Sequence, residues 1–471
     1  MSVNDFFVEK IIHNLNFTPT LCQEKLFSSL ACFVTQKDDS DILVVSGYAG
    51  TGKTSAIASF VKTLHQFQYK YVLLAPTGRS AKVLSNFTND KAYTIHKHIY
   101  RQKSLKDGVG QFKLNVNKAK DTFFIVDEAS LITINGGTNN IFGSGDLLDD
   151  LITFVKNGVD NKLIIIGDKG QLPPIGLSAS PALDLEYMKR FGKIFFSELT
   201  SVVRQANESG ILKNATIVRN MIEGNNNSVP KLIIDGFNDV ENISGGDLIG
   251  KLGDSIDKFG LDNVIVLCRS NKRANRYNSG IRSTILFREE KVTKGDKLMV
   301  VKNCYQFLEN IPELDFIANG DVAELIKISK YEIKYGINFA EAILSFPDYN
   351  DVEITAKVIL DTLESETPSL SPEIQKRLFE GVYEDYAEIK SKRKRFLAVR
   401  EDAYFNALQV KYASAITCHK SQGGQWPCVF IDNPFWNEEI SIDDLKWLYT
   451  AITRAVNKVF FVNFKMNFFK K

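Results

Sequence analysis

The sequence predicts an α/β fold with parallel sheets, and three observations lead to this prediction. Short, continuous apolar runs recur with helical or loop segments between them, which is the pattern of a parallel sheet covered on both faces. One run leads directly into a glycine-rich loop at residues 47–54, and a helical pattern follows that loop. The chain has 471 residues, of which 44% are hydrophobic and 24% are charged, so about three globular domains of roughly 150 residues are expected.

The first α/β unit is expected to extend to about residue 205. Two stretches interrupt the alternation of predicted strands and helices in this unit. Residues 101–120 are basic, with Asp-Gly-Val-Gly at their centre, and predict a protruding hairpin, while residues 135–145 are small and predict a loop. The predicted strands of this unit are five apolar, β-rich runs: Ile42–Ser46, Tyr71–Ala75, Thr122–Val126, Leu163–Ile166 and Lys193–Phe196.

A second α/β unit is expected to begin near Ser209, and an insertion divides it. The apolar run Asn263–Cys268 predicts a buried strand, and the basic stretch Asn271–Arg282 predicts a helix after it. The α/β pattern resumes near Lys411. The later strands of this unit are expected at Val429–Asp432 and Val459–Asn463.

The insertion itself predicts a small β domain followed by a charged helical arm. The arm is expected over Pro372–Phe405, and its basic run at 390–395 fits either a solvated helix face or a contact with nucleic-acid phosphates. The β segments of the insertion are expected at Lys291–Val301, Asp321–Ile326 and Ala340–Ile359.

Composition excludes several classes of protein. No apolar run reaches the roughly 18 residues of a membrane span, and the acidic N-terminus does not predict a signal peptide. The six cysteines are scattered without a CxxC pair, so neither a zinc site nor a disulfide framework is expected, and a cytoplasmic location follows. The net charge of +2 neither predicts nor excludes a nucleic-acid partner.

The loop GYAGTGKT fits the pattern G-x-x-x-x-G-K-[ST] and predicts a site for a nucleoside triphosphate with Mg²⁺. The glycines let backbone N–H groups point at phosphate oxygens, and the helix N-terminus adds partial positive charge. Lys53 would reach the β- and γ-phosphates, and the Thr54 hydroxyl would bind the magnesium ion. The alternative is a chance glycine turn. The expected nucleotide contacts are Gly47, Ala49, Gly50, Thr51, Gly52, Lys53, Thr54 and Ser55.

Two acidic residues follow the predicted strand Thr122–Val126. Asp127 would hold the magnesium shell, and Glu128 would orient and deprotonate the attacking water. Gln171, after the next strand, would sense the γ-phosphate or position the water. An acidic strand end with no catalytic role is the alternative.

The ordered motifs resemble those of the superfamily 1 DNA helicases, most closely the RecD- and Dda-like branch, superfamily 1B. The resemblance covers both α/β units, about two thirds of the chain. A long segment between VDEAS and GDKGQ departs from the family's minimal pattern. The motifs are FTPTLCQEKLF at 17–27, GYAGTGKT at 47–54, APTGRSA at 75–81, TIHK at 94–97, VDEAS at 126–130, GDKGQLPPIG at 167–176, ELTSVVRQ at 198–205, VLCRSNKRAN at 266–275, TCHKSQGGQW at 417–426 and LYTAITRA at 448–455.

This resemblance implies a particular division of the chain. Residues 1–95 and 121–205 would form a RecA-like domain, called 1A, and residues 206–289 and 405–471 a second one, called 2A. Residues 96–120 would form the 1B pin hairpin. Residues 290–404 would form the 2B insertion, with an SH3-like barrel and the charged arm.

The resemblance also implies roles at the nucleotide. Gln23 would read the adenine of ATP, and Arg204 and Arg454 would contact the γ-phosphate, where guanidinium groups stabilise the charge of phosphoryl transfer. ATP would then lie in the cleft between the two RecA-like domains. A structural salt bridge is the alternative for either arginine.

Other residues would contact the strand. Thr77, His96, Thr417 and His419 would line a groove that binds phosphates without reading sequence, and Phe112 would stack on the duplex junction. Lys420 and Gln422 would lie between the ATP site and the DNA groove and would couple them. The alternatives are structural histidines and a Phe112 that anchors the hairpin to its own domain.

The implied function is that of a monomeric, ATP-dependent DNA helicase that moves 5′ to 3′ on single-stranded DNA, unwinds duplex junctions and serves DNA replication, repair or recombination. One alternative is an RNA helicase or remodelling translocase of the same superfamily. Another is a phosphate-loop nucleotide switch or small-molecule kinase, which would need no second RecA-like domain.

Overall fold

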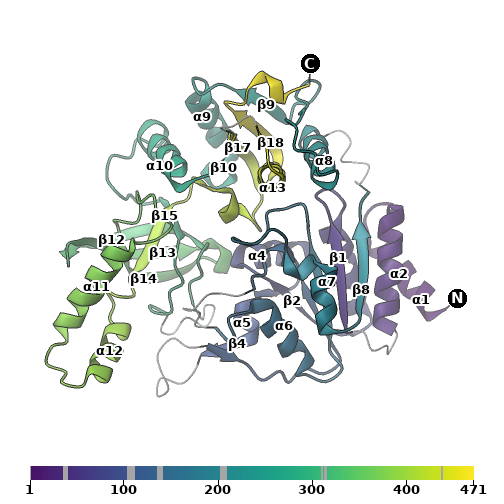
Figure 1. Ribbon diagram of the computed structural model, residues 1–471, viewed down its shortest axis with the longest axis horizontal. Helices are drawn as coiled ribbons and strands as arrows, with labels where there is room; N and C mark the ends of the chain where they lie inside the picture. Colours follow the sequence, from purple (N-terminus) through teal and green to yellow (C-terminus); the bar gives the residue numbers. More distant parts are fainter. Residues whose placement is uncertain are drawn as a thin grey trace.

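The computed structural model describes residues 2–35, 41–102, 112–134, 142–201, 209–308, 311, 316–435 and 439–470. Figure 1 shows one α/β unit at the lower right, a second at the top, and a barrel with a helical arm at the left. No helix among these residues is long and apolar enough to span a membrane.

The first sheet has six parallel strands in the order β3-β2-β6-β7-β1-β8. All five predicted strands are confirmed, and β3 is an addition that the sequence did not predict because it has only three residues. The strands are β1 (Ile42–Gly47), β2 (Lys70–Ala75), β3 (Ala92–Thr94), β6 (Thr122–Val126), β7 (Lys162–Gly167) and β8 (Ile194–Leu199).

Helices cover both faces of this sheet. Alternate residues of β7 divide between two cores, with Ile164 and Ile166 in one and Leu163 and Ile165 in the other. This division explains why the strands read as continuous apolar runs. On the first face lie α1 (Val3–Asn14), α2 (Leu21–Thr35), α3 (Lys53–Gln66) and α4 (Gly78–Thr88), and on the second α5 (Ile95–Ile99) and α6 (Leu147–Lys156).

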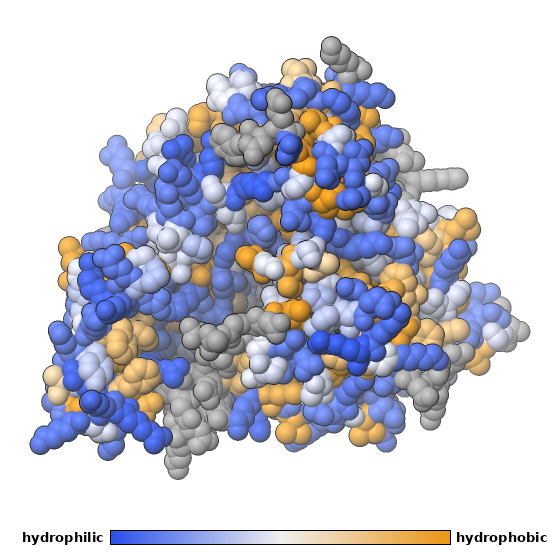
Figure 2. Space-filling view, in the orientation of Figure 1, coloured by the Kyte–Doolittle hydropathy of each residue, from blue (hydrophilic) through white to orange (hydrophobic). Residues whose placement is uncertain are grey.

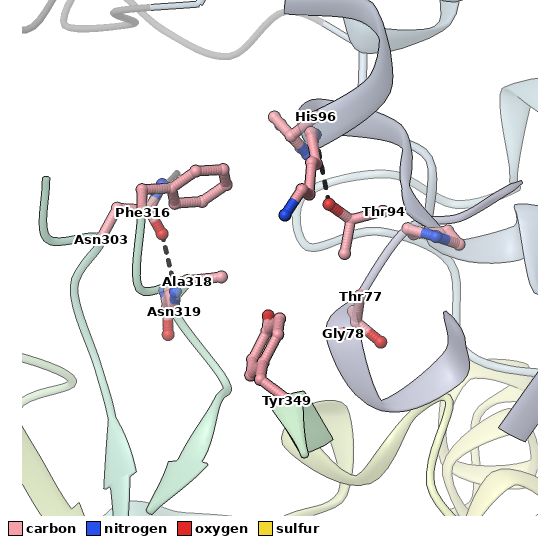
Figure 3. A pocket seen from close by; sticks show the side chains of 11 residues that line it. Thr77, Gly78, Thr94, His96, Asn303, Phe316, Ala318, Asn319 and Tyr349 are labelled. Atoms are coloured by element: carbon pink, nitrogen blue, oxygen red, sulfur yellow. Dashed lines mark hydrogen bonds between the residues drawn. The ribbon is translucent and has the colours of Figure 1, made fainter. Parts of the chain in front are cut away.

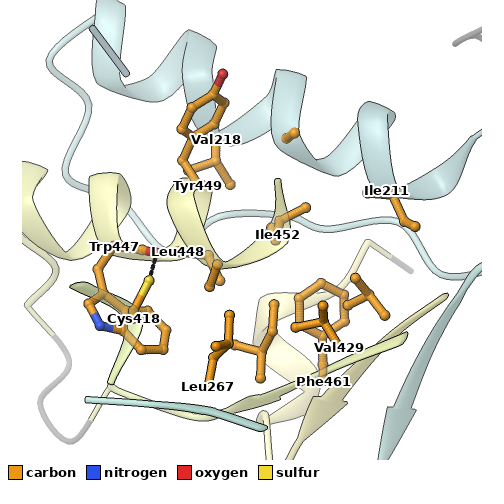
Figure 4. Packing of buried hydrophobic residues seen from close by; sticks show 14 of the residues in the cluster. Ile211, Val218, Leu267, Cys418, Val429, Trp447, Leu448, Tyr449, Ile452 and Phe461 are labelled. Atoms are coloured by element: carbon orange, nitrogen blue, oxygen red, sulfur yellow. Dashed lines mark hydrogen bonds between the residues drawn. The ribbon is translucent and has the colours of Figure 1, made fainter. Parts of the chain in front are cut away.

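The second sheet has five parallel strands in the order β16-β10-β17-β18-β9. They are β9 (Val240–Ile243), β10 (Val264–Cys268), β16 (Ala415–Thr417), β17 (Trp426–Asp432) and β18 (Ala455–Val462). One face packs against α8 (Gly210–Glu223) and α13 (Ile442–Ile452), whose apolar side chains meet those of the sheet in Figure 4. The other face packs against α9 (Leu248–Phe259) and α10 (Asn271–Gly280).

The insertion forms a small closed barrel, as predicted. Its strands are β11 (Lys297–Val300), β12 (Val322–Lys334), β13 (Ile337–Phe346), β14 (Val352–Ile359) and β15 (Leu408–Tyr412). The expected end of the insertion at residue 404 is too early, because β15 closes the barrel by pairing with β11 and β14. Such pairing depends on contacts between distant strands, which a local apolar pattern does not specify.

The charged arm consists of two helices, α11 (Pro372–Asp385) and α12 (Lys392–Glu401). Three basic residues of α12, Lys392, Arg393 and Lys394, are exposed. The tip of the arm is hydrophilic in the space-filling view (Figure 2). This exposure fits the solvated helix face that was one of the two interpretations of the basic run.

A hairpin is present at the predicted position, but its second strand ends at Leu114, six residues before the predicted end at 120. β4 (Tyr100–Gln102) pairs antiparallel with β5 (Phe112–Leu114). Its tip at 103–111 and most of the small-residue loop lie outside the described residues.

Candidate active site

The glycine loop joins β1 to α3 in the geometry of a phosphate-binding loop. Gly50 and Gly52 have φ angles of 75° and 74°, in the left-handed region that favours glycine. Gly52 precedes α3 without a side-chain cap, so the first N–H groups of α3 are available to an anion. Thr54 and Ser55 lie in that first turn.

Lys53 turns back toward its own loop. Its Nζ donates to the carbonyl oxygens of Gly47 and Tyr48, at 2.6 and 2.9 Å, and lies 3.7 Å from Asp168 Oδ2. A Cβ on Gly47 would lie 2.9 Å from Lys53 Cγ, so the loop needs glycine there to let the lysine pass.

Asp127 and Glu128 stand at the carboxyl end of β6. Burial, and then the neighbouring Glu128, raises the pKa of the Asp127 carboxyl to about 7. The positive charge of Lys53 opposes this rise only in part. A buried carboxylate and a hydroxyl are oxygen ligands of the type that Mg²⁺ prefers, so the chemistry of Asp127 and Thr54 fits the ion.

Gln171 has an unsatisfied polar atom. Its side chain is 5% exposed, and its buried Oε1 has no hydrogen-bond partner among the described residues. An orphaned acceptor of this kind points to a ligand or water, which is what its expected water-positioning role requires.

Gln23 lies behind the loop and is fully buried. Its amide nitrogen donates to the Thr51 carbonyl oxygen at 3.2 Å, and its amide oxygen accepts from the Thr20 N–H at 2.9 Å. In this conformation both ends of the amide bind protein backbone, so reading of adenine stays a prediction.

The second α/β unit contacts the loop through α13. The Ala49 N–H donates to the Tyr449 hydroxyl at 2.7 Å, and that hydroxyl donates to Asp168 Oδ2 at 2.8 Å. Beside it, the Leu172 N–H donates to Thr450 Oγ1 at 2.9 Å. The loop and the Asp168 motif therefore face the second unit directly.

Arg454 does not reach the loop in this structure. Its guanidinium is 3% exposed and donates to Thr450 O, Gly424 O and Thr453 Oγ1. The expected meeting of Lys53 and Arg454 is thus not formed here, and Tyr449 makes the contact instead. The other expected γ-phosphate ligand, Arg204, lies outside the described residues.

Thr77 and His96 line a cavity of about 100 Å³ between the first unit and the barrel. In Figure 3 they face Phe316, Asn319 and Tyr349. Thr77 caps α4 by accepting from the Ser80 N–H. Burial lowers the pKa of His96 to about 4, so its imidazole is neutral and offers a hydrogen bond rather than a charge.

Thr417 and His419 line a larger cavity, of about 460 Å³, between the second unit, the barrel and the first unit. Lys411 and Lys420 also line it, and burial lowers the pKa of each to about 8. Lys420 donates to Asn319 Oδ1, and Lys411 to two backbone carbonyls. No carboxylate among the described residues pairs with either ammonium group, so the cavity favours an anion.

Phe112 has a different position from the one expected. The ring is 6% exposed and packs against Phe142, Tyr305 and Phe316, with centroids 4.7, 5.0 and 6.3 Å away. In this structure the ring anchors the hairpin both to its own unit, through Phe142, and to the insertion, through Tyr305 and Phe316, so stacking on a junction stays a prediction.

Sequence reasoning missed three residues of these sites. Tyr449 lies within the quoted LYTAITRA motif, but nothing in the motif marks its hydroxyl. Asn319 lines both cavities from a barrel loop, and Lys411 lies on β15; neither position carries a local signal.

Two family models match the chain. One, described as an AAA domain, matches residues 31–232, and the other, described as a UvrD-like helicase C-terminal domain, matches residues 412–462. The ATP-dependent RecD2 DNA helicase of Deinococcus radiodurans is 28% identical over 199 residues. These matches support a helicase of superfamily 1B. The two matched regions contain the glycine loop and α13, whose contact joins the two units.

The other relatives differ in length from the chain. An uncharacterized protein of Methanocaldococcus jannaschii is 23% identical over 89% of the chain, and one of Acanthamoeba polyphaga mimivirus is 22% identical over 93%. The chain spans 36% of the first, 99% of the second and 24% of RecD2.

Solved Pif1 helicase structures are also similar to the chain. The Bacteroides protein in complex with ADP-AlF3 and single-stranded DNA is 14% identical, with a TM-score of 0.46, and covers 97% of this chain and 95% of its own. The Candida albicans protein is 15% identical with a TM-score of 0.40, covering 96% and 95%.

Proposed function

We propose that the chain is an ATP-dependent DNA helicase that moves 5′ to 3′ along single-stranded DNA and unwinds duplex DNA. ATP would bind between the two α/β units, and the strand would bind along the two polar cavities. We further propose that it acts as a monomer in the cytoplasm, in DNA replication, repair or recombination. The RecD2 relative is named as a DNA helicase, which supports DNA as the substrate.

One segment carries this proposal, because it links the two sites. Residues 417–422 line the larger cavity with Thr417, His419 and Lys420. At the end of the same segment, Gln422 Nε2 donates to the Leu172 carbonyl oxygen of the first unit at 2.6 Å. Movement at the nucleotide would be transmitted to the strand cavity through this segment of six residues.

Hydrolysis would use residues from both units. Lys53 would turn from its own loop to the phosphates, Glu128 would take the proton of the attacking water, and Gln171 would orient that water. Arg204 and Arg454 would stabilise the transition-state charge. Magnesium, held by Thr54 and Asp127, would neutralise charge on the phosphate oxygens.

Strand binding would rest on phosphates rather than on bases. The hydroxyls of Thr77 and Thr417 and the imidazoles of His96 and His419 are donors without sequence preference, and Lys411 and Lys420 supply positive charge. These donors would also accept RNA, so an RNA helicase is the second candidate within the family. A nucleotide switch or small-molecule kinase would leave the second unit and its cationic cavity without a role.

Unwinding assays test the proposal. Duplexes with a 5′ or a 3′ single-stranded tail, in DNA and RNA versions of equal length, are incubated with the chain and ATP. The proposal expects unwinding of the 5′-tailed DNA duplex and little of the others. Unwinding of the 3′-tailed duplex would reverse the polarity, and unwinding of RNA alone would favour the second candidate.

A further inference from the structure

Tyr449 places a hydroxyl oxygen inside the glycine loop. The side chain is 1% exposed, and its hydroxyl both accepts from the Ala49 N–H and donates to Asp168 Oδ2. In Figure 4 the ring lies at the edge of the apolar cluster of the second unit, with its oxygen pointing away from Leu448 and Leu267. One unit thus supplies a hydrogen-bonding oxygen to the phosphate-binding loop of the other.

Besides the Ala49 N–H, the lysine of the loop also has protein oxygens as its acceptors. Lys53 Nζ donates to the Gly47 and Tyr48 carbonyl oxygens. In a phosphate-binding loop the backbone N–H groups and the lysine face phosphate oxygens. The half-buried Ala49 N–H has the Tyr449 hydroxyl as its acceptor, in a loop whose N–H groups would otherwise be open to phosphate oxygens.

We propose that Tyr449 is a latch, a positioning residue whose hydroxyl holds the glycine loop and Asp168 against α13 until the phosphates of a nucleotide displace it. The proposal rests on nucleotide binding at the loop, as proposed above. Because α13 ends at Ile452, two residues before Arg454, displacement of the hydroxyl also releases the end of the helix from which this arginine follows. A nucleotide can shift the arrangement of the two units only by binding one arrangement better, and competition with the latch supplies that difference.

The hydroxyl, rather than the ring, is the part that acts. The ring packs edge to face on Tyr48, with centroids 6.5 Å apart, and a phenylalanine would keep this contact. Burial raises the pKa of the Tyr449 hydroxyl well above its usual value, so the group stays neutral and keeps its donor proton.

The test is a Tyr449→Phe variant, titrated with the fluorescent nucleotide mant-ADP and magnesium in the absence of DNA. Loss of the competing hydrogen bonds is expected to tighten binding about fivefold or more and to speed association. Tyr277→Phe is the matched control. The Tyr277 hydroxyl donates to Asp432 at 2.7 Å on the opposite face of the second sheet, and its removal is expected to leave mant-ADP affinity unchanged.

The outcomes separate the latch from the proposed function. If the unmodified chain binds mant-ADP and Tyr449→Phe binds it equally or more weakly, the latch is overturned and the nucleotide site stands. If the unmodified chain does not bind mant-ADP, both are overturned. Hydrogen exchange in the unmodified chain gives a second readout, because saturating ADP should speed exchange in α13 at residues 449–452; unchanged or slower exchange there contradicts the latch.

Discussion

Gln422 Nε2 donates a hydrogen bond of 2.6 Å to the carbonyl oxygen of Leu172, which lies 250 residues earlier in the chain. Leu172 follows Gln171, whose amide oxygen is buried and unpaired among the described residues. Gln422 follows His419 and Lys420 of the larger cavity. The bond is therefore a direct connection between the candidate nucleotide site and the candidate strand site.

Gln422→Ala should uncouple these two sites. Without the bond, strand binding no longer changes the position of Leu172, so stimulation of ATP hydrolysis by single-stranded DNA should fall about fivefold or more, while nucleotide affinity stays near its original value. Hydrolysis measured with and without DNA checks this. Gln306→Ala is the matched control, since its amide bonds Arg400 and Glu401 carbonyls within the insertion. Equal stimulation in both variants would remove Gln422 from the coupling.

Strand binding should weaken as pH rises from 7 to 9. Burial lowers the pKa of Lys411 and Lys420 to about 8, so both are ammonium groups below this pH and neutral amines above it. Only the ammonium form attracts phosphate.

In Lys411→Met, the salt dependence of strand binding should be weaker. The slope of log affinity for a single strand against log salt concentration should fall by about 0.7, the value for one phosphate contact on a single strand. Exposed Lys465→Met is the control, and equal slopes in the two variants would refute a phosphate contact at Lys411.

Asn319→Ala should weaken strand binding. Asn319 lines both cavities and accepts a hydrogen bond from Lys420, so its loss removes one polar contact with the strand and the hydrogen bond that positions that ammonium group. We expect a loss of affinity for an oligo(dT) strand of about fivefold, measured by fluorescence anisotropy. Exposed Asn227→Ala should bind normally. An unchanged affinity for Asn319→Ala would mean that the strand does not pass this loop.

Phe112→Ala should loosen the hairpin. The ring is buried among Phe142, Tyr305 and Phe316, and removal of a buried phenylalanine ring costs about 3–5 kcal/mol. Amide exchange in β4 and β5 should accelerate, and Phe112→Leu should restore most of the protection. If exchange is unchanged in Phe112→Ala while unwinding is lost, the ring acts on the junction after all.

Much of the fold was predictable because its signals are local. The parallel strands are continuous apolar runs, and Ile164 and Leu163 on β7 explain why, since adjacent residues enter different cores. The predicted end of the insertion at residue 404 was wrong, because β15 joins the barrel by pairing with strands far away in the sequence. An apolar run identifies a strand but not its neighbours.

The residues of the candidate sites fall into two similar groups: those that a local motif marks and those that only contacts between distant segments bring into place. The glycine loop and Asp127 were predicted from motifs whose chemistry is contained within a few residues. Tyr449 and Asn319 were missed because their contacts, with Ala49 and Lys420, arise only when distant segments meet. The buried position of Phe112 was not predictable because its aromatic partners come from two other parts of the chain.

Steady-state ATP hydrolysis, with and without single-stranded DNA, by the unmodified chain and by Arg454→Ala tests the two-unit site most directly. We predict that DNA strongly stimulates the unmodified chain, and that Arg454→Ala loses about 10³-fold or more of this activity while still binding DNA. Normal turnover by Arg454→Ala would contradict a site shared between the two α/β units.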